Sequence, residues 1–112
     1  MLVRALAALL RPVARRIAVD GVSMIPTYAP GEHVWAVRRW RRLRAQMVVV
    51  VALPGDQTRE IMKRVETIAG HEAWLVGDNS QASTDSRSFG SVPTRAITWV
   101  VHPQRRAIPI SS

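Results

Sequence analysis

Short apolar runs separated by turn residues make up most of the chain after residue 17. Five runs are rich in valine, isoleucine and tryptophan, which is typical of β-strands: residues 33–39, 47–53, 60–68, 73–76 and 96–101. Proline, glycine, asparagine and aspartate lie between them and mark turns. The pattern therefore predicts a small, mainly β domain over residues 17–102.

The first 17 residues follow a different pattern. Apolar residues recur there at helical spacing, and arginines lie on another face. This predicts a short basic amphipathic helix within residues 1–16, which Pro12 kinks or ends. Such a helix either lies on a membrane surface or docks on its own domain. At the other end, residues 103–112 contain two prolines and are predicted to form a loosely held tail.

The run over residues 60–68 places an ionisable group on its apolar face. Alternation puts Glu60, Met62, Arg64 and Glu66 on a charged face that we expect to face water, and Ile61, Lys63, Val65 and Thr67 on the other face. Lys63, the one lysine of the chain, then points toward the core. Burial there would lower its pKa, whereas a position at the strand end would let it reach solvent. The strand pattern leaves both interpretations open.

Composition narrows the classes of function. The 112 residues include 16 basic and 8 acidic side chains and no cysteine, which excludes disulfides, thiolate zinc sites and a cysteine nucleophile. Nine arginines form two acid-free clusters, within residues 1–19 and 38–44. Such clusters either touch nucleic acid or anionic lipid or are simply solvated. A basic nucleic-acid-binding module, with Trp40 as a stacking residue, would explain only this charge.

No run of residues is long enough to span a membrane, because no uncharged stretch is longer than that over residues 45–55. The six uncharged residues before Arg11 are too few for the apolar region of a secretory signal. We therefore expect a cytoplasmic protein, or one that contacts a membrane peripherally through its basic N-terminus.

Candidate chemistry centres on Ser23 and Lys63. No histidine is placed for a Ser-His-Asp arrangement, but a neutral lysine is a competent general base for a serine. Ser23 lies in the segment GVSMIPT, between Gly21 and Pro26, where the backbone turns tightly and can expose the hydroxyl and the N–H of Ser23.

Three segments, GVSMIPT (21–27), IMKRV (61–65) and GDNSQASTDSRSFGSVP (77–93), resemble in order the signature boxes of the type I signal peptidase family. These are serine peptidases with a Ser-Lys dyad. The resemblance implies a small β domain of the kind shared with LexA-type repressors, a partly open barrel of short strands. The DNA-binding domain of those repressors has no counterpart in this sequence.

The resemblance assigns roles residue by residue. Ser23 matches the nucleophile, Lys63 the general base, and Ser83 the serine whose hydroxyl helps to hold the lysine amine. Gly21 stands where some relatives have a serine that donates to the oxyanion. The oxyanion hole would then depend more on backbone N–H groups of the turn Gly21, Val22 and Ser23.

Further positions match substrate-binding and structural residues of the family. Met24 matches a residue that lines the pocket for the small side chain before the scissile bond, and Ile25 and Pro26 follow it. The structural set comprises Arg64, Gly77, Asp78, Asn79, Asp85, Ser86 and Arg87. Within it, Asp85 and Arg87 are expected to pair and brace the loop behind the site.

The function implied by the resemblance is removal of an N-terminal extension, a signal or a pro-peptide, from a polypeptide substrate, without a metal or cofactor. The short length and the missing span resemble the unanchored maturation proteases of nickel-type superoxide dismutase. A membrane-associated signal peptidase acting on exported preproteins is the alternative. The arginine-rich, acid-free N-terminus also resembles a mitochondrial transit peptide, which would favour an inner-membrane protease, although it is poor in serine. No nucleic acid partner is expected.

Overall fold

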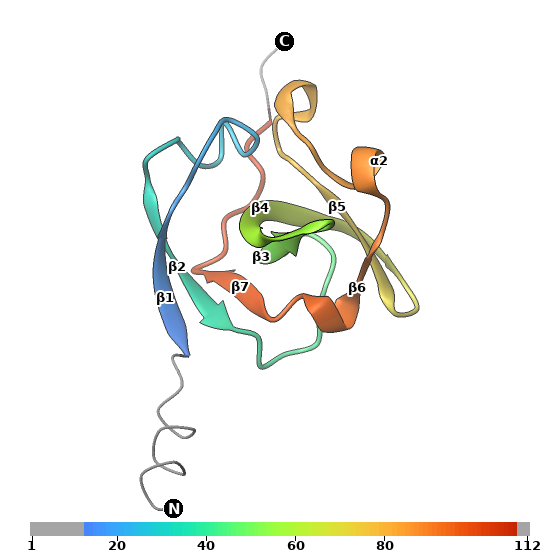
Figure 1. The fold of residues 1–112 in the computed structure, drawn as a ribbon. Helices are drawn as coiled ribbons and strands as arrows, with labels where there is room; N and C mark the ends of the chain where they lie inside the picture. Colours follow the sequence, from blue (N-terminus) through green and yellow to red (C-terminus); the bar gives the residue numbers. More distant parts are fainter. Residues whose placement is uncertain (1–12, 110–112) are drawn as a thin grey trace, which may run out of the picture.

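A computed structural model describes residues 13–109, in which seven strands form one antiparallel sheet (Figure 1). The strands are β1 (Ala14–Ala18), β2 (His33–Arg38), β3 (Val48–Leu53), β4 (Asp56–Ala69), β5 (Glu72–Val76), β6 (Val92–Pro93) and β7 (Trp99–His102). The helical segments between them are short: α2 (Ser86–Phe89) and 3₁₀ turns at Ser80–Ala82 and Thr94–Ala96. The predicted mainly β class is confirmed.

The sheet is rolled. Its strand order is β1-β2-β7-β3-β4-β5-β6, so β1 lies at one end and three strands separate it from β4. The Arg15 guanidinium on β1 nevertheless donates to both carboxylate oxygens of Glu60 on β4, at 3.0 and 2.8 Å. The curl brings the unpaired edge of β1 opposite β4, and the space between these two strands becomes the groove described below.

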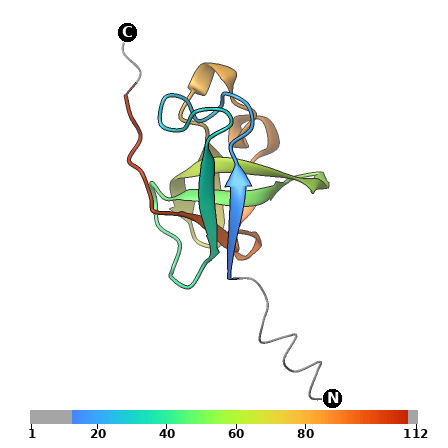
Figure 2. The same cartoon turned by 90° about the vertical axis from the view of Figure 1, so that its left-hand side faces the viewer.

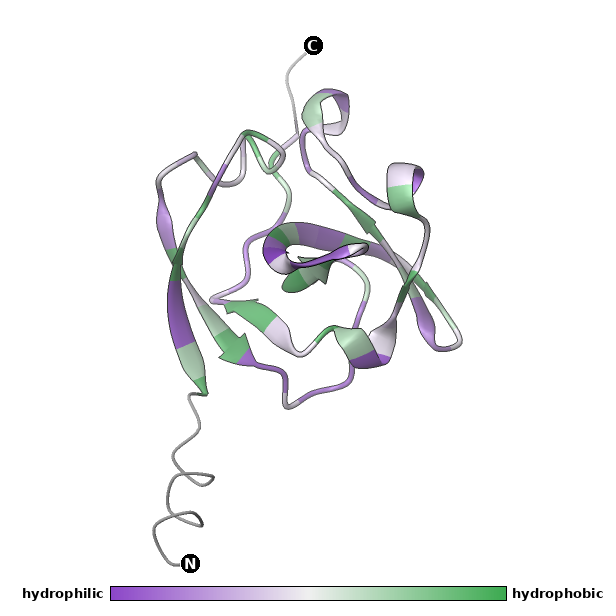
Figure 3. Cartoon of the chain, viewed as in Figure 1, coloured by the Kyte–Doolittle hydropathy of each residue, from purple (hydrophilic) through white to green (hydrophobic). Residues whose placement is uncertain are grey.

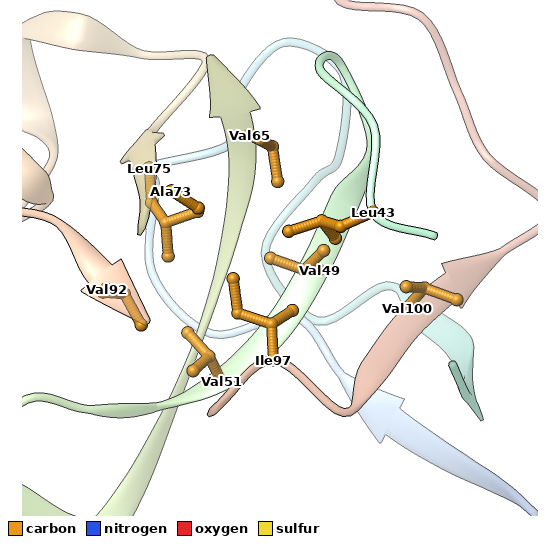
Figure 4. Packing of buried hydrophobic residues seen from close by; sticks show 9 residues of the cluster. All are labelled: Leu43, Val49, Val51, Val65, Ala73, Leu75, Val92, Ile97 and Val100. Carbon is orange, nitrogen blue, oxygen red and sulfur yellow. The ribbon is translucent and has the colours of Figure 1, made fainter. Parts of the chain in front are cut away.

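The central strand β3 is buried on both faces, as its unbroken valine run predicts. Val49 and Val51 pack on one side with Leu75, Ile97 and other residues of the core cluster drawn in Figure 4. Val48 and Val50 face a second cluster that includes Met24 and Tyr28 from the loop between β1 and β2. The Ser23 loop is therefore anchored in the core by its own side chains.

The structure corrects the prediction at the N-terminal side of the domain. Residues 1–12, which carry most of the predicted amphipathic helix, lie outside the described residues. Ala14–Ala18, assigned partly to that helix, form β1 instead, ahead of the predicted domain start at residue 17. The alternation typical of a strand was not recognised here, because the charged Arg15 occupies a position on the inward face. There it pairs with Glu60, and its guanidinium lies 4.3 Å from the centroid of the Trp99 ring.

The predicted strand over residues 96–101 is shifted: a 3₁₀ turn ends at Ala96, and β7 begins only at Trp99. Residues 104–108, predicted to be loosely held, are fastened by hydrogen bonds. The Gln104 side chain accepts from the Val48 N–H and donates to the Val48 carbonyl, and Arg105 donates to the carbonyl of Thr27. Figure 2 shows this segment running beside the loop between β1 and β2.

Candidate active site

A groove of about 400 Å³ runs between β1 and β4. Its walls are the chain from Ile17 to Met24 on one side and Arg59–Lys63 on the other, with Ala82 and Thr84 beside them. Val50 and Leu53 of β3 also line it. Ser23 and Lys63, far apart in the sequence, thus border the same groove.

The backbone around Ser23 is held by the loop that follows β5. The Asn79 N–H donates to the Ser23 carbonyl at 2.8 Å, and the Asn79 side-chain amide donates to the Val22 carbonyl at 3.1 Å. Gly21 begins the turn with a φ of +73°, a conformation that favours glycine. A serine at this position would be strained in this backbone. With the carbonyls of Val22 and Ser23 bound to Asn79, the turn is fixed at the edge of the groove.

Lys63 is 4% exposed and lies opposite Val49 in the β3–β4 ladder. Of the two interpretations that the strand pattern left open, burial on the core side is the one that the structure shows. No carboxylate among residues 13–109 is within ion-pairing distance of its amine. Burial lowers the pKa of Lys63, the Asp85 carboxylate partly opposes this, and the Arg87 charge adds to the lowering. The amine therefore loses its proton more readily than that of an exposed lysine.

Ser83 lies behind the groove, and its hydroxyl is buried without a hydrogen-bond partner among the described residues. It is near enough to the Asp85 carboxylate to help lower the pKa of Asp85, but its geometry falls short of a hydrogen bond. A buried hydroxyl without a partner is costly.

Asp85 and Arg87 pair as the resemblance implies, with Arg87 donating to both oxygens of the Asp85 carboxylate at 2.9 Å. Asp85 is fully buried, so desolvation alone would raise its pKa; hydrogen bonds from Arg87 and the Gly77 N–H hold it well below the usual range instead. Ser86 accepts from the Leu75 N–H. These bonds fix the 77–87 loop against β5.

Arg64 contradicts the prediction that its face of the strand is exposed to water. Its guanidinium is buried and donates to both oxygens of Asp78, at 2.7 and 2.8 Å, and to the carbonyls of Gln46 and Arg105. Asp78 also accepts from the Thr27 hydroxyl. The side chains of Lys63 and Arg64, adjacent along β4, are therefore both buried, the first toward one core cluster and the second in a polar network.

Met24 lines the groove, as the resemblance implies, but Ile25 and Pro26 do not. Thr84 also lines the groove; it lies within the third motif, but no role was predicted for it. Three further groove residues carried no signal in the sequence: Asp20, Arg59 and Glu60. They belong to no motif, and only the roll of the sheet brings them together. No group of three potential metal-ligating side chains occurs in the described part of the chain, nor does a helix there have the length and apolarity to cross a bilayer.

The fold and the groove together define a mainly β domain in which a serine at a tight turn and a buried lysine share one cleft. No family model matches the chain. It is similar to the mitochondrial ATP-independent inner membrane protease subunit 1a of Arabidopsis thaliana, with 31% identity over 70% of this chain and 62% of that protein. It is also similar to the human mitochondrial inner membrane protease subunit 1, with 29% identity over 69% of this chain and 60% of that protein.

The chain spans about three fifths of the length of these two relatives. Both relatives are protease subunits by name, which agrees with the peptidase resemblance of the motifs. Neither is a nickel superoxide dismutase maturation protease, so this narrower expectation gains no support. Both names place the relatives themselves in the mitochondrial inner membrane.

Proposed function

We propose that the chain is a serine endopeptidase of the type I signal peptidase family, which removes an N-terminal extension from a precursor protein. The observation that carries the proposal is the shared groove of Ser23 and Lys63, with the lysine buried and without an ion-pair partner in the described range. Similarity to two protease subunits supports the same class.

The chemistry follows from the protonation state of Lys63. Its neutral amine accepts the proton of the Ser23 hydroxyl as the serine oxygen attacks the substrate carbonyl. The Ser23 N–H, at the positive-φ turn after Gly21, stabilises the oxyanion. The C–N bond then breaks, and Lys63 returns the proton to the leaving amine. Water hydrolyses the acyl-enzyme with Lys63 as base again, and the Ser83 hydroxyl orients the amine.

The groove suits an extended polypeptide. β1 pairs only with β2, and β4 pairs with β5 only from Arg64 onward, so both strands have unpaired edges beside the groove. A substrate strand can bond to such edges through its backbone, while pockets between them select side chains. Buried Met24 limits the space next to Ser23 and favours a small residue before the scissile bond.

A cleavage assay with matched serine variants tests the proposal. The full chain is offered a signal-peptide-bearing preprotein and, separately, a nickel superoxide dismutase precursor. We expect cleavage of at least one, with loss of activity in Ser23→Ala and full activity in the control Ser88→Ala, which removes an exposed hydroxyl on α2. Intact mass spectrometry should detect the acyl-enzyme on Ser23. Equal cleavage by the Ser23→Ala protein would refute the assignment, and cleavage of the preprotein alone would reject the dismutase-processing role.

Gly77→Ala should reduce cleavage roughly a hundredfold, because displacements of about 1 Å can cost that much. A Cβ at Gly77 would lie 2.2 Å from Ser83 Oγ and 2.7 Å from the Ser23 carbonyl oxygen, so one of the two must move. Gly70→Ala is the control for backbone strain away from the groove, since its φ of +59° disfavours alanine but its Cβ would meet nothing within 4 Å. The measurement is kcat/KM for both proteins. Equal values for the two variants would show that the contact at Gly77 does not position the site.

A further inference from the structure

One prominent motif of the sequence has no part in the proposed catalysis: the arginine-rich stretch that follows β2. It begins at the end of the β1–β2 ribbon opposite to the loop that carries Ser23 (Figure 1). Together with neighbouring strand residues it forms a surface that we call the Trp–Arg surface. Its members are exposed: Arg16, Trp35, Trp40, Arg41, Arg42 and His102.

The sheet register places these side chains together. Arg16 lies opposite Trp35 in the β1–β2 ladder, and Trp35 lies opposite His102 in the β2–β7 ladder, so the three project from one face. The Trp40 ring meets the His102 ring edge-on with centroids 6.3 Å apart, and the Arg41 guanidinium lies 5.7 Å from the Trp40 centroid. One continuous surface results.

Two indole rings on this surface are largely exposed to water: Trp35 is 52% exposed and Trp40 63%. Trp35 is not part of the core, because Val34 and Ala36 are the residues of β2 that point inward. Neighbouring exposed aromatic rings are unusual on a monomer and mark an interaction site. The surface thus has an apolar component that gains from leaving water.

The surrounding charge has a single sign. Residues 33–55 contain no acidic side chain, and the connection from β2 to β3 is largely hydrophilic in Figure 3. None of the ion pairs within the described range involves Arg16, Arg41 or Arg42. These guanidinium groups are therefore available to an external anion.

We propose that the Trp–Arg surface docks peripherally on an anionic lipid bilayer. Indole rings prefer the headgroup region, where their apolar body and polar N–H are both accommodated. Arginines beside them pair with lipid phosphates, and the two signals together suffice for reversible attachment. Single-stranded nucleic acid is the competing anionic partner; the Arg41 guanidinium over one face of the Trp40 ring leaves one face fewer for base stacking.

Vesicle binding by the full chain tests the proposal without any proteolysis. The protein is co-sedimented with phosphatidylcholine vesicles, with and without phosphatidylglycerol, and its fluorescence is measured with brominated acyl chains. We expect at least tenfold tighter binding to the anionic vesicles, weakened by salt, and quenching that Trp40→Phe with Trp35→Phe reduces.

Variants locate the contact. Arg41→Gln with Arg42→Gln should weaken binding at least tenfold, as should Trp35→Ser with Trp40→Ser. Arg59→Gln with Arg106→Gln, which removes the same charge elsewhere, should bind like the parent. If this control pair lost as much vesicle affinity, the binding would depend only on net charge, and the proposal would be overturned.

Two other outcomes also overturn it. If labelled single-stranded DNA binds more tightly than the anionic vesicles and loses affinity in the same variants, the surface serves nucleic acid. If iodide fails to quench Trp35 and Trp40 in the lipid-free protein, another part of the chain or a second copy already covers them.

Discussion

Lys63→Met should abolish cleavage to the level of Ser23→Ala and leave the folded protein at least as stable as the parent. Methionine fills similar space without a group to desolvate, and no ion pair of the described residues is lost with the amine. Activity and urea unfolding are measured on the same preparation. Retained turnover would exclude Lys63 as the base. Lys63→Arg should be equally inactive, because arginine stays protonated.

The pH dependence offers a second readout of the same residue. Because burial lowers the pKa of Lys63, kcat/KM should fall as pH decreases through that lowered value and the amine becomes charged. The folded state binds this proton less readily than the unfolded chain does. Stability from this group should therefore rise with pH from the lowered pKa toward the ordinary value of about 10.4. Lys63→Met should remove this rise in stability. If the variant kept the same rise, the pH dependence of stability would come from another group.

Asp78→Asn should destabilise the fold by about 3–5 kcal/mol, the range found when one partner of a buried ion pair is removed. The Arg64 and Asp78 side chains are only 4% and 3% exposed, so the guanidinium would keep its charge without its carboxylate. The measurement is the free energy of unfolding in urea at neutral pH.

Glu60→Gln is the matched control, since Arg15 and Glu60 form the same two-bond contact at 31% and 44% exposure. Exposed pairs contribute about 0–1 kcal/mol. A loss in Asp78→Asn no larger than in Glu60→Gln would show that burial of the pair adds nothing to its effect.

The sequence predicted the positions of the strands well, but it did not predict which groups would pair with the charged residues on them. The alternation of β4 put Lys63 on the apolar face but left open whether its amine reached solvent, and only the fold shows it buried opposite Val49. Arg64 was wrongly predicted to face water, because a charged side chain is expected at the surface unless a buried ion-pair partner is known. That partner, Asp78, comes from the loop beyond β5, so only the folded chain reveals the pair.

The candidate site shows the same division. Ser23 and Lys63 were predicted from motif resemblance, and the structure brings both to one groove. The rest of the groove wall, with Asp20 and Arg59, depends on how far the sheet rolls, which no local pattern encodes. Gln104 was missed for a related reason: its amide takes the place of a strand neighbour for Val48, a role without a sequence signature.

The hydrogen bonds of residues 104–108 bear on the order of events during translation, because they hold the loop that carries Ser23. Arg105 bonds Thr27 and Glu32 and accepts from Arg64, and the Ile108 N–H donates to the Thr27 hydroxyl. The loop carrying Ser23 thus waits for one of the last described segments to be translated. Such long-range closure slows folding. On the ribosome, the nascent chain should therefore stay inactive, and open to protease attack at that loop, until residue 108 has left the exit tunnel.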